Sequence, residues 1–469
     1  MTLATPATKT MYFEQFYLSC LAHASYMLGS EGEAVVVDPQ RDVEIYLEAA
    51  AERGLKIRHI FETHLHADFV SGHKELAKKT GAAIYIGARA EAAFPHVALH
   101  NGFAVEFGRG KATVLETPGH TPESICLLIT DLEKSERPWA VLTGDTLFLG
   151  DVGRPDLSRT HTPQELAGLL YDSLHNQLMT LPDDVVVYPA HGAGSLCGRN
   201  MRAEKSSTIG TERLTNYALQ IQSREEFVRQ LTENLPARPE YFLKDAEINR
   251  SGAVGLDELP PLRGLAPREV QELIADGTPA LDVRPGDSFA AAHVPGSINI
   301  GLSGQFATWA GTVLGLEARP ILIADTDEQI AEARVRMARV GIDAERGYLA
   351  GGVEGWKQAG LPVAQTAQMT VEELAAAVRH GGIAVLDVRR EPERNAGHLS
   401  PSSWWPLDRF QAQLPSVQRD VPLAVHCKSG YRSMIACSLL QLAGFENVTN
   451  VTGGFDAWEK AGYPVETRA

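Results

Sequence analysis

The chain is poor in three features that would each indicate a particular class of protein. Its five cysteines are scattered and odd in number, so we expect reduced thiols in a cytoplasmic protein rather than a disulfide framework. It has no apolar run of about eighteen residues, and the N-terminal segment MTLATPATKTMYFEQFYLSC has no apolar core, which argues against a membrane span and a signal peptide. Basic residues are in deficit, with 43 Lys and Arg against 59 Asp and Glu and a net charge of −16, which argues against nucleic acid or an anionic membrane as a partner.

The segment FETHLHADFVSGH, Phe61 to His73, is unusually dense in possible metal ligands. In an extended segment, residues two apart point to the same side, so His64, His66 and Asp68 can face one cavity. Imidazole suits iron and zinc, and a carboxylate completes a mixed nitrogen and oxygen site. The sequence therefore predicts a metal-binding loop here.

Other candidate ligands follow apolar runs elsewhere in the first half of the chain. From Met11 to about Leu243 the pattern is one of short β-rich runs with a few helices. His120 in PGHTPES, Asp145 in TGDTLF and His191 in YPAHGAGS each lie just past such a run, as His64 does. Strand ends that meet on one rim can build a site from distant parts of the sequence.

This ordered set of motifs resembles the metallo-β-lactamase fold, an αββα sandwich with metals at the strand ends. That family usually reads HxHxDH, where the last histidine helps to hold a second metal. Here the equivalent residue is Phe69, which has no lone pair to donate. We therefore expect a single metal, which makes the two-metal hydrolases a poorer match.

With one metal, we expect His64, His120 and Asp145 as its ligands. Two histidines and a carboxylate form the facial triad of non-haem Fe(II) oxygenases. This resembles the persulfide dioxygenase branch of the superfamily, and the resemblance implies one Fe(II) per chain, O2 and a low-molecular-weight thiol persulfide of glutathione or coenzyme A type as substrates, and sulfite as product. Three more residues, which we expect to orient ligands or water through hydrogen bonds, are His66, Asp68 and His191. Metal ligation by His66 and Asp68 remains the alternative.

Two further residues near these motifs have competing interpretations. Arg154, in the loop LFLGDVGRPDL, is suited to bind the carboxylate or phosphate of a thiol carrier, and it could equally pair with Asp151 or Asp156. The resemblance places this loop beside the thiol substrate and favours binding. Cys197 follows His191 closely, but we expect a buried, inert thiol.

After a stretch rich in Gly and Pro, the chain repeats itself. LDVRPGDSFAAAHVPGSINI matches LDVRREPERNAGHL, GGVEGW matches GGFDAW, and the spacing between the copies is nearly constant. Alternating helices and apolar strands predict small parallel α/β sheets, and both copies resemble the rhodanese domain. We therefore expect an α/β multidomain chain, divided into a metallo-β-lactamase-type domain over 1–248, a linker over 249–267, an inactive rhodanese-like domain over 268–365 and an active rhodanese domain over 366–469.

The second copy contains the motif HCKSGYRS, His426 to Ser433, between an apolar strand and a helix. A cysteine on such a loop meets backbone N–H groups and the positive end of the helix, which stabilise a thiolate. We expect Cys427 to be the nucleophile, with Lys428 and Arg432 binding the sulfur oxyanion. The remaining loop residues are expected to form the substrate pocket: Ser429, Gly430, Tyr431 and Ser433. Related phosphatase loops are one residue longer, so the loop length favours sulfur transfer.

In the first copy, the corresponding loop reads DTDEQ, Asp325 to Gln329, which has no nucleophile and would repel an anion.

Over nearly its full length, the chain resembles a persulfide dioxygenase–rhodanese fusion. The resemblance implies interconversion of thiol persulfide, sulfite and thiosulfate, with homo-oligomerisation possible. One alternative is a thioesterase of glyoxalase II type fused to a rhodanese. Another is a sulfur-relay protein in which the first domain only binds thiols.

Overall fold

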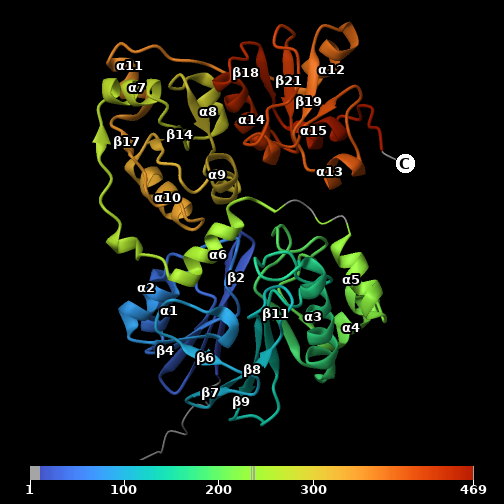
Figure 1. Cartoon of the computed structure of the whole chain (residues 1–469). Helices are drawn as coiled ribbons and strands as arrows, with labels where there is room; N and C mark the ends of the chain where they lie inside the picture. The colour runs from blue at the N-terminus through green and yellow to red at the C-terminus, as the bar shows by residue number, and fades with distance from the viewer. Residues whose placement is uncertain (1–10, 234, 236–237, 468–469) are drawn as a thin grey trace, which may run out of the picture. The chain divides into compact units, whose positions relative to one another are not determined.

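The computed structural model describes residues 11–233, 235 and 238–467 (Figure 1). They form two compact units, of which the first comprises Met1–Leu259 with Ala338–Gly341 and the second Pro260–Met337 with Ile342–Ala469. Residues 1–10, which include half of the N-terminal segment examined above, lie outside the described residues. Within the described part, no helix is long and apolar enough to cross a membrane.

The first unit is built on two six-stranded sheets. One has the order β1-β2-β3-β4-β5-β6 and the other β12-β11-β10-β9-β8-β7. The strands of the first sheet are β1 (Tyr12–Leu18), β2 (His23–Ser30), β3 (Glu33–Val37), β4 (Lys56–Glu62), β5 (Ala83–Gly87) and β6 (Val97–Leu99). Those of the second are β7 (Ala104–Phe107), β8 (Gly110–Glu116), β9 (Ile125–Asp131), β10 (Ala140–Gly144), β11 (Val186–Pro189) and β12 (Ser207–Thr208).

Six helices complete the first unit. They are α1 (Glu44–Glu52), α2 (His73–Thr80), α3 (Pro163–Asn176), α4 (Ile209–Thr215), α5 (Arg224–Thr232) and α6 (Phe242–Ser251). In Figure 1, α1 and α2 lie on the outer side of the first sheet, and α3 to α5 lie on the outer side of the second. Helix α3 begins with a capping box, in which Thr162 and Glu165 satisfy each other's backbone N–H groups.

Three hydrophobic clusters hold these layers together. Phe61, Val114 and Leu127 belong to a cluster between the two sheets. Separate clusters join the first sheet to α1, where Tyr46 is fully buried, and the second sheet to α3, where Leu170 is fully buried. Because each sheet buries both of its faces, the order of layers is helix, sheet, sheet, helix. The expected αββα sandwich is confirmed.

The second unit contains two five-stranded sheets, in which every pair of neighbouring strands is parallel. Their orders are β13-β17-β16-β14-β15 and β18-β22-β21-β19-β20, which have the same form. The strands of the first copy are β13 (Gly264–Leu265), β14 (Ala280–Asp282), β15 (Ser297–Asn299), β16 (Ile321–Ile323) and β17 (Gly347–Leu349). Those of the second are β18 (Ala367–Met369), β19 (Ala384–Asp387), β20 (Ser403–Trp404), β21 (Leu423–His426) and β22 (Val448–Val451).

Helices lie between the strands of both copies, as the alternating pattern predicts. In the first copy they are α7 (Pro267–Ala275), α8 (Gly286–Ala291), α9 (Phe306–Leu314), α10 (Asp327–Ala338) and α11 (Gly352–Gln358). In the second copy they are α12 (Val371–His380), α13 (Glu391–Ala396), α14 (Tyr431–Leu442) and α15 (Gly454–Lys460). Helix α12 begins with a capping box, in which Thr370 and Glu373 satisfy each other's backbone N–H groups. Two rhodanese-like domains with small parallel sheets are therefore confirmed.

The predicted linker differs from the structure at its first residues. Helix α6 extends to Ser251 and ends at Gly252, whose φ of +79° suits glycine. Asn249, expected at the start of the linker, therefore lies in the last turn of this helix, where its side chain is fully buried.

Candidate metal centre and sulfur-transfer loop

Three strands of the first unit end at one buried cluster. His64 follows β4, His120 follows β8, and Asp145 directly follows β10. The Oδ2 atom of Asp145 lies 3.8 Å from Nε2 of His64 and 3.4 Å from Nε2 of His120. All three residues are at least 99% buried. The structure thus brings together the three residues that we expect to hold the metal.

Hydrogen bonds on the far side of each ring orient the two histidines. Nδ1 of His120 lies 2.9 Å from the carbonyl oxygen of Arg154 and therefore donates its hydrogen. The Thr63 hydroxyl donates to Asp38, so it accepts a hydrogen from Nδ1 of His64, 3.0 Å away. Both Nε2 atoms then carry a lone pair that faces the Asp145 carboxylate. This arrangement is how proteins fix the tautomer of a metal-ligating histidine.

The donor set fits a bound metal ion. Among the described residues, Nε2 of His64, Nε2 of His120 and Oδ2 of Asp145 are buried and have no hydrogen-bond partner. A buried polar atom without a partner costs about 1–3 kcal/mol, so three that face one another require an explanation. A cation coordinated by two nitrogens and one oxygen provides it.

The protonation states agree with this interpretation. Burial lowers the pKa of His64 well below its usual value and also lowers that of His120, so both rings are neutral. Burial alone would raise the pKa of Asp145, but the positive charge and the hydrogen bond of His191 hold it well below its usual value. The cluster therefore offers two neutral imidazoles and one carboxylate anion.

Asp68 and His191 lie beside this cluster, and His191 contacts both Asp68 and Asp145. Nδ1 of His191 lies 2.7 Å from Oδ1 of Asp145, and its Nε2 lies 2.8 Å from Oδ2 of Asp68. Burial lowers the pKa of His191, but the two carboxylates outweigh burial and raise it well above its usual value. Oδ1 of Asp145 thus contacts His191, and its Oδ2 faces His64 and His120. The orienting role expected of these residues stays a prediction.

The His66 ring packs against that of His64, at a centroid distance of 4.1 Å, and its Nε2 faces two buried carboxylates. Its Nε2 lies 3.1 Å from Oδ1 of Asp38 and 3.6 Å from Oε2 of Glu62. The ring of Phe69 packs against the rings of His66 and His23, at centroid distances of 4.4 and 4.1 Å. Phe69 therefore fills with hydrocarbon the position where the wider family has a histidine.

Arg154 is engaged within the protein. Its guanidinium binds Asp156 through two hydrogen bonds of 2.6 and 2.8 Å, which is one of the two ion pairs considered above. Binding of a thiol carrier by Arg154 stays a prediction. The Cys197 thiol is buried, as expected, and its sulfur lies with Asp68 and His191 in a second cluster of possible metal ligands.

Sequence reasoning missed Asp38 and His23, which shape this site, and did not predict how Asn249 contacts the ligand loop. Asp38 accepts hydrogen bonds from Thr63, and His23 packs against Phe69. The amide of Asn249 donates to the carbonyl oxygens of His66 and Phe69, at 2.7 Å each, and thus holds the ligand loop. Asp38 ends the apolar run EAVVVDP, so the strand-end argument could have identified it. The hydrogen bonds of Asn249 to this loop have no spacing signal, because they depend only on tertiary packing.

In the second unit, Cys427 lies on the loop between β21 and α14. The backbone N–H of Gly430 donates to its sulfur at 3.2 Å, and the Ser433 hydroxyl lies 3.5 Å away. Gly430 has a φ of +102°, which the tight turn requires and which side chains disfavour. Cys427 is 1% exposed. The loop therefore presents the Gly430 N–H to the sulfur, as expected of a loop that stabilises a thiolate.

The other loop residues differ in their surroundings. Arg432 makes two hydrogen bonds of 2.6 Å to Glu393 of α13, a partner that the sequence did not indicate. Lys428 and Ser429 are exposed, where an incoming anion can reach them. The Tyr431 hydroxyl donates to the carbonyl oxygen of Gly301. Their catalytic and binding roles stay predictions.

The first copy has the same local geometry without the nucleophile. Asp282 binds Arg284 as Asp387 binds Arg389 in the second copy. Asp282 pairs with Ile323 in the sheet, and Asp387 pairs with His426, so Ala324 occupies the position of Cys427. The first copy therefore has no thiol at the position of the nucleophile.

Comparison with known proteins agrees with this architecture. The metallo-beta-lactamase superfamily model matches residues 18–191, and the rhodanese-like domain model matches residues 266–359 and 370–461. The mitochondrial persulfide dioxygenase ETHE1 of Bos taurus is 31% identical to this chain over 220 residues. The match covers 45% of this chain and 77% of the relative. The Homo sapiens protein of the same name is 30% identical with the same coverage. A hydroxyacylglutathione hydrolase of Francisella philomiragia is 32% identical over 177 residues, 38% of this chain and 65% of the relative.

Among solved structures, a metallo-beta-lactamase from Staphylococcus aureus is 31% identical, with a TM-score of 0.65. The match covers 72% of this chain and 99% of the Staphylococcus aureus chain.

Fold and site together define a metallo-beta-lactamase-fold domain followed by two rhodanese-like domains. Within that class, the chain belongs to the persulfide dioxygenase family, in a form fused to rhodanese domains.

Proposed function

We propose that the first domain is a non-haem Fe(II) persulfide dioxygenase and that the second rhodanese copy transfers sulfane sulfur through Cys427. The observation that supports the proposed dioxygenase is the buried cluster of two neutral imidazoles and one carboxylate beside Phe69. Iron(II), one ion per chain held by His64, His120 and Asp145, would supply the O2-dependent oxidation of a low-molecular-weight thiol persulfide to sulfite. The carrier thiol is of glutathione or coenzyme A type.

The protein's own residues prepare this site. The Arg154 carbonyl and the Thr63 hydroxyl fix the ring orientations of His120 and His64. His191 holds one oxygen of Asp145, which leaves the other oxygen facing the two imidazoles. The burial of all three ligands excludes bulk water, which would compete for a bound cation and hydrolyse a reactive sulfur species.

In the second site, the Cys427 thiolate attacks the outer sulfur of thiosulfate or of a thiol persulfide. The S–S bond of the donor breaks, sulfite or the carrier thiolate leaves with the bonding electron pair, and Cys427 becomes a persulfide. Sulfite or a thiolate then attacks the outer sulfur of that persulfide and restores the Cys427 thiolate. The N–H of Gly430 and the cation of Arg432 stabilise the negative charge on sulfur in both steps.

A thioesterase is the second candidate, because the hydroxyacylglutathione hydrolases are also relatives. Phe69 argues against it, since that position cannot hold a second metal. Oxygen uptake with glutathione persulfide supports the dioxygenase, and release of thiol from an acylglutathione without oxygen uptake supports the hydrolase. A sulfur relay, the third reading, requires a first domain that shows neither activity.

Two substitutions test the division into two sites. We expect His64→Ala to abolish oxygen uptake with glutathione persulfide and to leave sulfur transfer from thiosulfate unchanged, because only the first site loses a ligand. We expect Cys427→Ser to have the opposite effect. Both activities are measured on the full chain after anaerobic loading with iron. Loss of both activities in either folded variant contradicts the division.

A further inference from the structure

The first rhodanese-like copy has no nucleophile, yet it packs directly on the helix that follows the Cys427 loop. Met434 of α14 belongs to one buried cluster with Phe289 and Ala290 of α8. The backbone N–H of Asn299, at the end of β15, donates to the Ser438 hydroxyl of α14 at 3.1 Å. Helix α14 is thus held against the first copy along its length.

Within the loop, Tyr431 makes the most direct contact with the first copy. Its hydroxyl donates to the carbonyl oxygen of Gly301 at 2.8 Å. Its ring lies against Gly304, where a Cβ atom would overlap the ring carbons. Tyr431 directly follows Gly430, whose N–H reaches the Cys427 sulfur, and one residue separates it from Ser433. The position of the Tyr431 side chain therefore constrains the turn that surrounds the sulfur.

The opposite wall of the sulfur site also touches the first copy. Arg390, just before α13, lies over the Trp309 ring of α9, 5.7 Å from its centroid. Glu393, in the first turn of α13, holds Arg432. The two segments that position the loop, one through Tyr431 and one through Arg432, therefore both contact the first copy.

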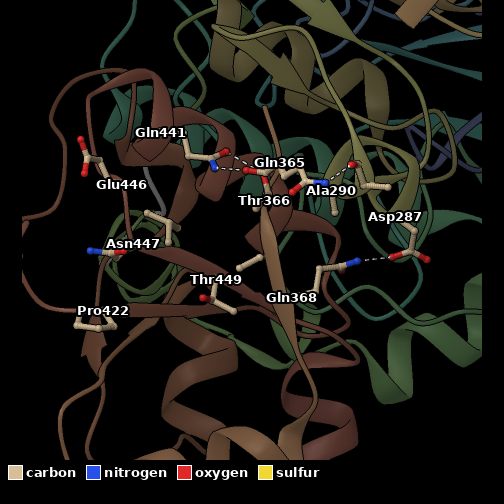
Figure 2. Close-up of a pocket in the computed structure, with 13 residues that line it drawn as sticks. Asp287, Ala290, Gln365, Thr366, Gln368, Pro422, Gln441, Glu446, Asn447 and Thr449 are labelled. Carbon is tan, nitrogen blue, oxygen red and sulfur yellow. Dashed lines mark hydrogen bonds between the residues drawn. The ribbon is translucent and has the colours of Figure 1, made fainter. Parts of the chain in front are cut away.

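The first residues of the second copy are tied to the first copy and to α14, as Figure 2 shows. Thr366 donates its hydroxyl to Gln441 of α14, and its backbone N–H donates to the carbonyl oxygen of Ala290. The Gln368 amide donates to Asp287 of α8 at 3.2 Å. These bonds shorten the effective link between the copies and favour the docked arrangement.

We propose that the first copy is a positioning element for sulfur transfer, and that it acts through the contact of Gly301 and Gly304 with Tyr431. This proposal rests on the proposed role of Cys427. The carbonyl of Gly301 sets the place of the Tyr431 side chain, and this fixes the turn that aims the Gly430 N–H at the sulfur. The degenerate copy thus contributes to the reaction without touching the substrate.

Tyr431→Phe in the full chain tests the proposal most directly. Formation of the Cys427 persulfide from thiosulfate is followed in single turnovers by rapid quench and mass spectrometry of the Cys427 peptide. We expect the limiting rate to fall about fivefold, the usual effect of one hydrogen bond. We expect the half-saturating thiosulfate concentration to stay unchanged, because the Tyr431 hydroxyl donates to the Gly301 carbonyl of the first copy. A rise in that concentration with an unchanged limiting rate would assign Tyr431 to substrate binding and overturn the proposal.

Ser438→Ala is the matched control. It removes another hydrogen bond between the copies, but from the middle of α14 and away from the loop. We expect it to lower the unfolding midpoint of the second unit and to leave the limiting rate unchanged. An equal fall in rate for both variants would assign Tyr431 only a general structural role and overturn the proposal.

A double-mutant cycle tests the specific pair. Gly304→Ala displaces the Tyr431 ring, so we expect it to slow persulfide formation, and we expect no further effect of Gly304→Ala in a Tyr431→Leu background. Additive effects, or an unchanged rate in Gly304→Ala, contradict the proposal. If Cys427→Ser still transfers sulfur, the proposed function itself fails, whatever the cycle shows.

Discussion

At the scale of single residues, the direction of each hydrogen bond in the metal site follows from a few groups that can only accept. The Asp38 carboxylate receives the Thr63 hydroxyl, which leaves that oxygen to accept from His64. The Arg154 carbonyl can only accept from His120. Both histidines therefore present lone pairs to the site before any metal binds, which lowers the cost of assembling it.

Glu62 provides a pH-dependent test of the surroundings of this site. Burial raises its pKa to about 8, with His66 and the Ser71 hydroxyl opposing the shift and Asp38 reinforcing it. The folded protein thus keeps a proton that the unfolded chain loses above its usual pKa of 4.5. The contribution of this proton to the free energy of unfolding is fully present below pH 4.5, and it is lost as the pH rises through about 8.

We therefore expect Glu62→Gln, which retains the shape of the neutral side chain, to remove this pH dependence. The gain in stability of the variant over the wild type should grow by roughly 1 kcal/mol for each pH unit between about pH 5 and about pH 8. Urea unfolding of both proteins at a series of pH values, with equal metal content, measures the difference. A gain that is the same at every pH contradicts the prediction.

At the scale of elements, the start of α15 closes the Cys427 loop from behind. The N–H of Phe455 donates to the carbonyl of Cys427 at 2.8 Å, and that of Asp456 donates to the carbonyl of Lys428 at 3.0 Å. Gly454 permits this approach, since its φ is +55° and a Cβ there would lie 2.5 Å from the Cys427 carbonyl oxygen. The loop is thus held by two helix N-termini, those of α14 and α15.

This packing predicts different costs for two glycine substitutions in the same copy. Gly462 also has positive φ, at +73°, but a Cβ there meets no described atom within 4 Å. We expect Gly462→Ala to cost about 1 kcal/mol from backbone strain alone, and Gly454→Ala about 3 kcal/mol, because it also forces the loop away. Urea unfolding of the second unit measures both costs. Equal losses of stability for the two variants would show that the close approach of Gly454 to the Cys427 loop does not limit side-chain size there.

At the scale of the whole molecule, the chain consists of two compact units with separate cores and separate chemistry. The candidate metal ligands all lie in the first unit, and Cys427 lies in the second. A ligand that binds only the folded form of one unit stabilises that unit by mass action. Metal binding therefore provides a way to separate the two unfolding transitions.

We expect removal of the metal with a chelator to lower the midpoint of one calorimetric transition and to leave the other within error. Sulfur transfer from thiosulfate should persist in the metal-free protein, and His64→Ala should reproduce its calorimetric profile. Differential scanning calorimetry with and without chelator measures the shift, with Cys427→Ser as the control that changes neither midpoint. An equal shift of both transitions contradicts the independence of the units.

Local sequence was enough to predict those parts of the protein that short segments of the chain determine. Alternating apolar runs predicted the strands, and candidate ligands after them predicted that His64, His120 and Asp145 would meet. The capping box of Thr370 and Glu373 and the loop around Cys427 were predictable for the same reason. In each case neighbouring residues determine the backbone, so the pattern can be read without knowing the fold.

Tertiary structure alone decided which distant side chains complete each site. Asn249 holds the loop that contains His66, and Glu393 occupies Arg432, although neither pairing has a spacing signal. For Arg154, the structure decided between the two expected partners in favour of Asp156. The contact of Tyr431 with Gly301 joins residues of different copies. Hydrogen-bond partners far apart in the sequence are selected by packing, because only the folded chain fixes which polar groups lose water and must find one another.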